Sequence, residues 1–305
     1  MLTEASSPGA AGAADPPVLA VTNTFWTRED TPIRHGFTAE LGRWPNASVR
    51  AAPFHTQPET ARRLINTDVA ATTRGLIPQL LGPGSITLST AATLVNALYL
   101  KAAWRNRFPD RGTAPCPFHT PAGPITVPTM RLDKRLGYAA GDGWQVVVLP
   151  AAGDVEAVVL LPSNDLGTAE AALDADTLAG LLNAPVVLPL VLYLPKFRVR
   201  VRSNLTTALD TLGVRTMFTD RADFGGITDK PLSVSSVRHE AVLTIDEQGL
   251  EGAAATAAVM RAMALHRDIA EPVVVRVDRP FLFLVRHRTS GVVYFLARVT
   301  RPRSD

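Results

Sequence analysis

Apolar residues in the first half of the chain recur at two spacings, which predict strands and one long helix. Runs of strand character cover residues 18–26 and 93–100. Between them, Pro58 opens a helical pattern. Its apolar side chains return at helical spacing, at Leu64, Ile65, Val69 and Ile77. The 108–145 segment is rich in Pro and Gly, which favours hairpins and turns.

The middle of the chain predicts strands and helices in separate groups. Strands are expected at 145–149, 155–161 and 186–194, the first two joined by a turn at 151–154. Helices are expected at 168–182 and 204–212. Ser203 is placed to cap the second helix, and Gly213 to close it.

The last third predicts strands, which end in an antiparallel hairpin with a turn at 289–291. The strand-like runs lie at 241–245, 273–277, 281–285 and 292–299. Strands grouped apart from helices indicate an α+β fold rather than alternating βαβ units. Residues 1–17 are small and Pro-bearing and predict a disordered leader, followed by one domain over 18–305.

Composition and charge exclude several classes of protein. The chain has 305 residues, of which 46% are apolar and 19% charged, so it is neither disordered nor fibrous. The single Cys116 cannot form an internal disulfide. The net charge of +3 is small, and no basic stripe with interleaved aromatics accompanies it, so no nucleic-acid partner is expected. No apolar run is long enough to span a membrane, so no membrane partner is expected, and no secretory signal is visible.

The sequence motifs of common enzymes are absent. There is no G-x-S-x-G, no P-loop, no H-E-x-x-H and no G-x-G-x-x-G. The histidines are scattered along the chain, without the spacing that metal ligation favours. They are His35, His55, His119, His239, His266 and His287. We therefore expect no catalytic residue and no metal site.

One segment in the last third has two acceptable conformations. From Glu247 the chain reads EQGLEGAAATAAVMRAMALHRDIAEP. This run predicts either an Ala-rich helix or an exposed loop that is able to become a strand. If this run forms a strand, one of its faces carries no charge, and Glu251 falls on the other face. The uncharged face comprises Leu250, Gly252, Ala254, Thr256 and Ala258. Such a segment indicates a conformational switch.

Several motifs, in order along the chain, resemble the serpin family. The region 275–285, which reads VRVDRPFLFLV, is similar to the signature that follows the reactive loop. LVNALYLK at 94–101, with Trp104 and Phe108, is similar to the strand that leads into the family's breach. Further matches are the family's INxWVxxxTxGKI helix at 65–77, its LPKF helix at 194–197 and its ADFSGI element at 222–227. The resemblance extends from about Val18 to Pro302.

The resemblance implies a serpin fold, with large mixed and antiparallel sheets, surrounding helices and an exposed reactive loop. It implies an inhibitor of serine proteases, not an enzyme, which needs no cofactor and acts as a monomer. The protease cleaves the loop and forms a covalent acyl complex, and the loop then inserts into sheet A. A cysteine protease is a second class of target. Family members are commonly extracellular, although without a visible signal a cytoplasmic location stays open.

The resemblance also assigns residues. The hinge that inserts comprises Glu247, Gly249, Leu250, Glu251, Gly252, Ala253, Ala254, Ala255 and Thr256. Family spacing puts the reactive bond at Met263–Ala264, and Met suits chymotrypsin-like or elastase-like proteases. Arg261 and Arg267 lie near and loop length varies, so other target classes stay open. Asn96 and His239 match the shutter pair beneath the opening sheet, and Trp104 matches the breach tryptophan.

Two departures from the family pattern leave alternatives open. Inhibitors usually have Thr or Ser where this chain has Leu250, and slower insertion would turn an inhibitor into a substrate. The helices that precede Val18 in the family have no match, so we expect an N-terminally truncated fold, with one sheet face open to water and Asn96 and His239 short of partners. The alternatives are a non-inhibitory binding or chaperone-like protein and an incomplete, inactive serpin.

Overall fold

The computed structural model describes residues 17–44, 46–250 and 271–303. The described chain divides into two compact units. Of the described residues, the first unit contains 17–18, 100–199, 243–250 and 271–303, and the second contains 19–44, 46–99 and 200–242. The predicted leader lies outside the described residues except for its last position. The first strand begins at Val18, where order is expected.

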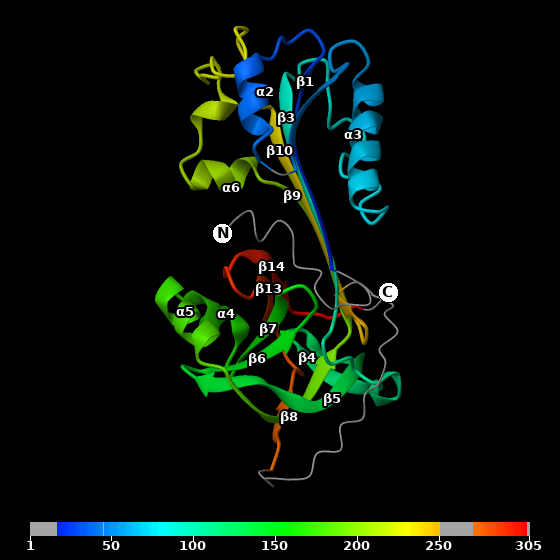
Figure 1. The fold of residues 1–305 in the computed structure, drawn as a ribbon, viewed down its shortest axis with the longest axis vertical. Helices are drawn as coiled ribbons and strands as arrows, with labels where there is room; N and C mark the ends of the chain where they lie inside the picture. The colour runs from blue at the N-terminus through cyan, green and yellow to red at the C-terminus, as the bar shows by residue number, and fades with distance from the viewer. Residues whose placement is uncertain (1–16, 45, 251–270, 304–305) are drawn as a thin grey trace. The chain divides into compact units, whose positions relative to one another are not determined.

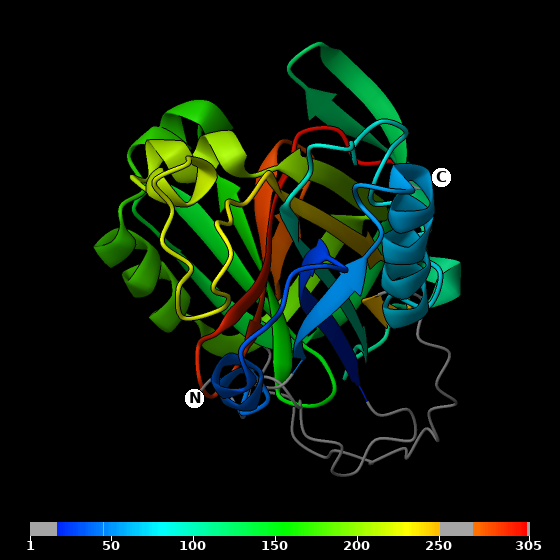
Figure 2. The ribbon, with the colours of Figure 1, turned by 90° about the horizontal axis from the view of Figure 1, so that it is seen from above.

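One mixed sheet has six strands in the order β2-β1-β3-β11-β10-β9. The strands are β1 (Val18–Arg28), β2 (Ala47–Ala52), β3 (Ala92–Ala103), β9 (Phe197–Asn204), β10 (Ser236–Ile245) and β11 (Gly249–Leu250). Within the second unit, helix α3 (Pro58–Thr72) lies on one side of this sheet, and α2 (His35–Leu41) and α6 (Thr206–Thr211) lie on the other (Figures 1 and 2).

Alternation along the strands explains the two packed faces of the second unit. Trp26 and Val95 join Ile65 of α3 in one core cluster. The residues one position earlier, Phe25 and Leu94, belong to a cluster on the other side. Successive side chains of a strand point to opposite faces, so single-residue steps in β1 and β3 separate the two clusters. The spacing of Ile65 and Val69 places both on the buried face of α3, where neither is exposed.

The second sheet has eight strands and lies within the first unit. Its order is β12-β8-β5-β6-β7-β13-β14, and β4 pairs with β5. The strands are β4 (Ala114–Thr120), β5 (Gly123–Gly141), β6 (Trp144–Pro150), β7 (Val155–Pro162), β8 (Val186–Pro195), β12 (Val273–Arg276), β13 (Phe281–His287) and β14 (Val293–Val299). Every residue of β7 is buried, as expected for a strand covered on both faces. Short 3-10 turns lie at Asp110–Gly112 and Thr216–Phe218.

The structure corrects the helix predicted at 168–182. The segment forms two helices, α4 (Leu166–Ala171) and α5 (Ala175–Asn183). Asp174 interrupts the pattern because its carboxylate accepts a hydrogen bond from the Thr177 amide at 2.8 Å and caps a new helix. Apolar residues of both helices still pack on β6, β7 and β13, as the periodicity predicts.

Two further local predictions are wrong. Ser203 is the penultimate residue of β9 and caps no helix. Instead, the Asn204 side chain accepts a hydrogen bond from the Thr206 hydroxyl at 2.8 Å. The LPKF segment is not helical, since residues 194–197 join the end of β8 to the start of β9. Its β-branched and aromatic neighbours favour this extended conformation.

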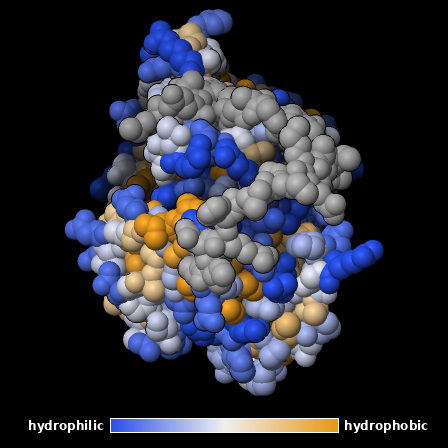
Figure 3. All heavy atoms as spheres, turned by 60° about the horizontal axis from the view of Figure 1, so that its bottom comes forward, coloured by the Kyte–Doolittle hydropathy of each residue, from blue (hydrophilic) through white to orange (hydrophobic). Residues whose placement is uncertain are grey.

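The surface of the described residues is unevenly polar. Figure 3 shows a face on which apolar residues gather in one area bordered by hydrophilic ones. In the first unit, large apolar side chains exposed to water include Val186, Val187, Val274, Val293 and Leu296. No described helix is long and apolar enough to cross a membrane. Among the described residues, no group of histidine, cysteine or acidic side chains could hold a metal ion.

Candidate functional site

The start of the predicted hinge is a short strand between two long ones. Gly249 and Leu250 form β11, which pairs antiparallel with Ala103 and Ala102 of β3. On its other side Leu250 pairs with Ile245 of β10. Leu250 has no exposed surface. Two residues of the hinge thus already occupy the place of a central strand, and a leucine fits at the position where it departs from the family pattern.

Gly249 permits this strand because no side chain fits there. A Cβ at Gly249 would lie 2.2 Å from the carbonyl oxygen of Ala102 and 2.9 Å from the Cα of Ala103. Both are backbone atoms, so a rotamer change could not relieve the clash. Close approach of two backbones is one of the roles that only glycine fills.

Asp246 shapes the turn from β10 into β11. Its Oδ1 accepts hydrogen bonds from the amides of Gln248 at 2.8 Å and Gly249 at 3.1 Å. The Asp246 amide donates to the Gly249 carbonyl oxygen at 3.2 Å. An aspartate that bonds the backbone two residues ahead mimics a turn. The chain is thereby reversed within three residues and directed between the flanking strands.

Glu247 is a buried carboxylate with two side-chain partners. Its Oε2 lies 2.7 Å from Lys196 Nζ, and its Oε1 accepts a hydrogen bond from the Thr113 hydroxyl at 2.6 Å. Burial by itself would raise the pKa of the Glu247 carboxyl. The hydrogen bonds from Lys196 and Thr113 outweigh burial and hold this pKa below its ordinary value. Glu247 is therefore ionised at neutral pH and fixes the base of the hinge.

Trp104 lies against the same turn. Its indole Nε1 donates to the Asp246 carbonyl oxygen at 2.9 Å, and its amide donates to the Gln248 carbonyl oxygen at 3.0 Å. The ring is 3% exposed and makes an edge contact with Phe108 at 6.4 Å between centroids. The Phe108 amide donates to the Glu247 carbonyl oxygen at 3.1 Å. Trp104 therefore contacts the backbone of the hinge base, where the resemblance expects the breach tryptophan.

Asn96 and His239 are neighbours in the second unit. They are register partners on the parallel strands β3 and β10. His239 Nδ1 lies 2.6 Å from Asn96 Oδ1, and Asn96 Nδ2 donates to Asn23 Oδ1 of β1 at 2.6 Å. The amide oxygen of Asn96 only accepts, so this geometry requires a proton on His239 Nδ1. The predicted shortage of partners is wrong for Asn96, because the pairing of β1 with β3 brings Asn23 within hydrogen-bond distance.

Burial favours the neutral form of His239. Desolvation lowers the pKa of its imidazole, although the charge of Glu240 raises it in part. At neutral pH the shutter pair is thus an uncharged hydrogen-bonded unit. Such a pair can be separated without exposing an ion to an apolar environment.

An apolar pocket of about 380 Å³ lies beside the shutter pair in the second unit. Its lining includes Asn23 and Asn96, the aromatic rings of Phe25 and Phe224, and no charged residue. The sheet face at Asn96 therefore borders a cavity rather than a closely packed layer of side chains.

The structure brings some predicted residues together and leaves others undescribed. Glu247, Gly249, Leu250 and Trp104 form one site in the first unit, the hinge site, and Asn96 and His239 are paired in the second. The remaining predicted residues lie outside the described residues, namely Glu251, Gly252, Ala253, Ala254, Ala255, Thr256, Met263 and Ala264.

Three contacting residues were missed by sequence reasoning. Thr113 and Lys196 lie far from Glu247 in sequence, and Asn23 is equally remote from Asn96. Lys196 belongs to the LPKF motif, so the sequence marked this residue as part of a family motif but did not indicate that it binds Glu247. For Thr113 and Asn23 the sequence carried no signal, because only the sheet pairings bring them near.

The chain is similar to the same group of proteins in sequence and in fold. Leukocyte elastase inhibitor of Bos taurus is 31% identical over 300 residues, which cover 94% of this chain and 78% of that protein. Plasminogen activator inhibitor 1 of Bos taurus is 29% identical over 296 residues, covering 93% of this chain and 72% of that protein. The crystal structure of uncleaved ovalbumin superposes with a TM-score of 0.85 at 26% identity, over 99% of this chain and 77% of that chain.

A family model described as Serpin (serine protease inhibitor) matches residues 5–302. The described architecture is that of the serpin fold, as the resemblance of the motifs predicted. Members of the family are protease inhibitors or non-inhibitory binders, not enzymes. Because this model matches nearly the whole chain and a relative is 31% identical over 94% of it, the chain belongs to the serpin family.

Proposed function

We propose that this chain is a suicide-substrate inhibitor of serine proteases with chymotrypsin-like or elastase-like specificity. The observation that carries the proposal is β11. Gly249 and Leu250 are hydrogen-bonded as a strand between β3 and β10, with Leu250 fully buried. The residues that follow them carry no charge on the alternate positions of one face, so their sequence is compatible with extension of that strand.

The chemistry belongs to the target protease. Its serine oxygen attacks the carbonyl carbon of Met263, the bond to the Ala264 nitrogen breaks, and that amine leaves with a proton from the protease. Met263 remains esterified to the protease. Water would complete hydrolysis unless the loop inserts first, carries the protease with it and distorts its active site. Insertion of a serpin loop is an established case of strand addition to a sheet.

Insertion along this path must separate β3 from β10. Their parallel pairing includes His239 with Asn96 and extends from Ser236 with Thr93 to Ala241 with Leu98. A strand placed between them regains backbone hydrogen bonds on both edges, which offsets the loss of the original ladder. The neutral state of His239 supports the proposal, because no ionic pair has to be broken at this point.

The test is to mix the purified chain with chymotrypsin, elastase and trypsin separately. A band of higher mass that resists denaturation is expected with chymotrypsin or elastase, and mass spectrometry should locate the cut at Met263–Ala264. A band with trypsin and a cut after Arg261 or Arg267 would overturn the assigned specificity. Cleavage with all three proteases and no band would overturn the inhibitory mechanism.

Two matched variants test the inserting face. Ala254→Asp places a charge on the face that carries Leu250, so we expect cleavage without trapping. Ala255→Asp adds the same charge one residue later, on the other face, and should keep most of the trapped complex. Equal behaviour of the two variants would contradict the assigned face.

Leu250 favours a second candidate function, that of a non-inhibitory binding protein with the serpin fold. Its side chain is larger than the Thr or Ser typical of inhibitors. Because Leu250 already lies in β11, any slowing of insertion would fall on the extension of that strand beyond it. This candidate predicts efficient cleavage with no trapped complex. Leu250→Thr distinguishes the two, since it should restore trapping only if the leucine is what slows insertion.

A further inference from the structure

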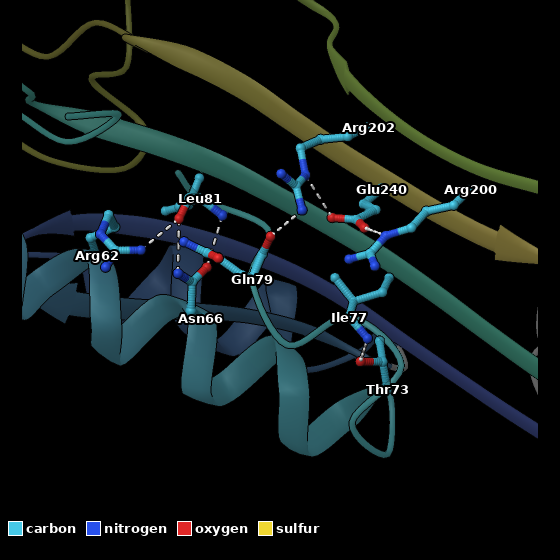
Figure 4. Close-up of polar contacts among 9 residues, drawn as sticks. All are labelled: Arg62, Asn66, Thr73, Ile77, Gln79, Leu81, Arg200, Arg202 and Glu240. Carbon is cyan, nitrogen blue, oxygen red and sulfur yellow. Dashed lines mark hydrogen bonds and ion pairs between the residues drawn. The ribbon is translucent and has the colours of Figure 1, made fainter. Parts of the chain in front are cut away.

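The segment that follows helix α3 is held to that helix by its own side chains. We name residues 77–81 the α3 linker. Asn66 Nδ2 donates to the Leu81 carbonyl oxygen at 2.9 Å, and the Leu81 amide donates to Asn66 Oδ1 at 2.8 Å. Arg62 Nη1 also donates to the Leu81 carbonyl oxygen, at 2.7 Å. These contacts fix the end of the linker to α3 (Figure 4).

The start of the linker is fixed in the same way. Thr73 Oγ1 accepts a hydrogen bond from the Ile77 amide at 3.2 Å, and the Thr73 hydroxyl donates to the Val69 carbonyl oxygen at 2.7 Å. Thr73 is fully buried. Both ends of the linker are therefore bound by residues that belong to α3 or directly follow it.

The centre of the linker has a different kind of partner. Arg202 of β9 donates from Nη2 to the Gln79 carbonyl oxygen at 2.5 Å. The same guanidinium donates from Nε to Glu240 Oε2 at 3.1 Å. Arg202 thus joins the linker to β9 and, through Glu240, to β10 (Figure 4).

Glu240 is a buried carboxylate with no exposed surface. Arg200 Nε donates to its Oε1 at 2.6 Å, and Arg202 binds its other oxygen. Removing one cationic partner from a buried carboxylate costs folding free energy. Each arginine is therefore favoured in its position beside Glu240. Glu240 follows His239, and strand alternation puts their side chains on opposite faces of β10.

The chain connectivity shows which strands these contacts join. The α3 linker leads into β3, whereas Arg202 and Glu240 belong to β9 and β10. Glu240 is paired in register with Ala97 of β3, so it lies on the ladder that a new strand would separate. The Arg202 contact with Gln79 therefore connects the β3 side of the sheet to the β10 side.

We propose that Arg202 and Glu240 are positioning residues that hold the α3 linker across the β3–β10 pairing and slow the opening of the sheet. The inference rests on the proposed function, because this opening is the step that admits the loop. Separation of the two strands requires either that Arg202 releases Gln79 or that the linker leaves α3, and the second costs several hydrogen bonds.

Arg200 provides a matched control. It binds the same carboxylate, and its side chain is 40% exposed, against 48% for Arg202. Among the contacts of the described residues, it has none to the linker. Arg200→Met and Arg202→Met each remove one partner of Glu240, so they should lower global stability alike. Only Arg202→Met frees Gln79.

The experiment is hydrogen exchange of the full chain, without any protease. In Arg202→Met we expect the Ile77 and Leu81 amides to exchange about tenfold faster than in Arg200→Met, since a hydrogen bond from a charged donor to the linker is lost. Arg202→Lys should give an intermediate rate, because an ammonium cannot span both oxygens. Equal linker exchange in the two Met variants, at equal urea midpoints, would overturn the proposal.

A second measurement follows the opening itself. A synthetic peptide that copies residues 250–263 is incubated with each variant, and its incorporation is followed by native gel. Incorporation should be fastest in Arg202→Met, and wild-type rates in that variant would also overturn the role assigned to Arg202. If the wild type traps no protease, the proposed function fails, while the exchange comparison still decides whether Arg202 holds the linker.

Discussion

The hinge site and the shutter pair differ in how firmly the protein holds them. At the hinge site, Glu247 has a cationic and a hydroxyl partner, Trp104 donates twice to the turn, and Gly249 leaves no room for a Cβ. At the shutter pair, a single chain of hydrogen bonds joins Asn23, Asn96 and His239 beside an apolar pocket.

This difference suits a sheet that opens from a fixed starting point. If the loop inserts as proposed, the hinge base keeps its position while the chain beyond it moves, so a dense set of contacts is useful there. Under the same proposal the shutter pair separates, and a neutral, half-buried pair separates at low cost. Under the proposed function, anchoring and opening therefore belong to different residues of one sheet: those that follow β3 and β10 at the hinge site, and those within β3 and β10 at the shutter pair.

The largest effect is expected from Gly249→Ala. The added Cβ would meet the Ala102 carbonyl oxygen, so β11 must leave its place, at a cost of about 3 kcal/mol or more in unfolding free energy. Urea unfolding measures this loss. Gly36→Ala is the control, since a Cβ there meets nothing within 4 Å. A wild-type midpoint for Gly249→Ala would remove the argument for close approach.

Glu247→Gln should have the next largest effect. It keeps the size of the side chain but leaves Lys196 without its charged partner, a loss of about 2 kcal/mol at neutral pH. The folded pKa of Glu247 lies below its ordinary value of 4.5, so its stabilisation is present above that pH and is lost as pH falls through the folded pKa. The two unfolding curves should therefore converge in acid.

The control for Glu247→Gln is Asp133→Asn. Asp133 pairs with Arg131 at 3.3 Å, but both side chains are largely exposed. Its replacement should change the unfolding free energy by no more than about 0.5 kcal/mol. If the two variants lost equal stability, Glu247 would not be a special anchor.

His239→Gln tests the neutral state of the shutter pair. The folded pKa of His239 is lowered from 6.5, so its contribution to stability is complete above that pH. As pH falls, the unfolded chain takes up the proton that folded His239 resists, and stability declines. The variant should lack this part of the decline in urea unfolding measured from neutral pH into mild acid. His119→Gln, which removes an exposed imidazole, serves as the control.

The smallest effect is expected from Asn23→Ala. It removes the acceptor of the Asn96 amide at an exposed position, where water can replace it, so the cost should be no more than about 1 kcal/mol. In the trapping assay the same change should raise the amount of trapped complex per protein cleaved, because it loosens β3. A loss of stability as large as that of Glu247→Gln would mean that the two regions are equally anchored.

Much of the fold could be predicted from local patterns. The spacing of Ile65 and Val69 places both on the buried face of α3, and the strand-like runs correspond to β1, β3, β6, β7 and β8. The break at Asp174 was missed because a cap residue inside an apolar pattern competes with helix continuation. The extended LPKF segment was missed because its conformation follows from the strands it joins.

The candidate site was predictable only where a motif carried it. Glu247, Gly249, Asn96 and His239 were all named from the sequence. The structure places Asn96 on β3, His239 on β10 and Gly249 on β11, and it places Glu247 in the turn between β10 and β11. Thr113 and Asn23 were not, because each lies far along the chain from the residue it binds.

The amino-acid sequence by itself determined where most of the helices and strands lie and to which family the motifs point. It also determined that one segment near the C-terminus consists mainly of small residues, carries no charge on one face and is flanked by strand-like runs. These are properties of residues close together in the chain. The tertiary structure alone decided that Leu250 is buried between β3 and β10, that Lys196 and Thr113 hold Glu247, and that Arg202 ties the α3 linker to Glu240. Such contacts depend on strand pairing between distant segments, and pairing is set by the whole sheet rather than by local propensity.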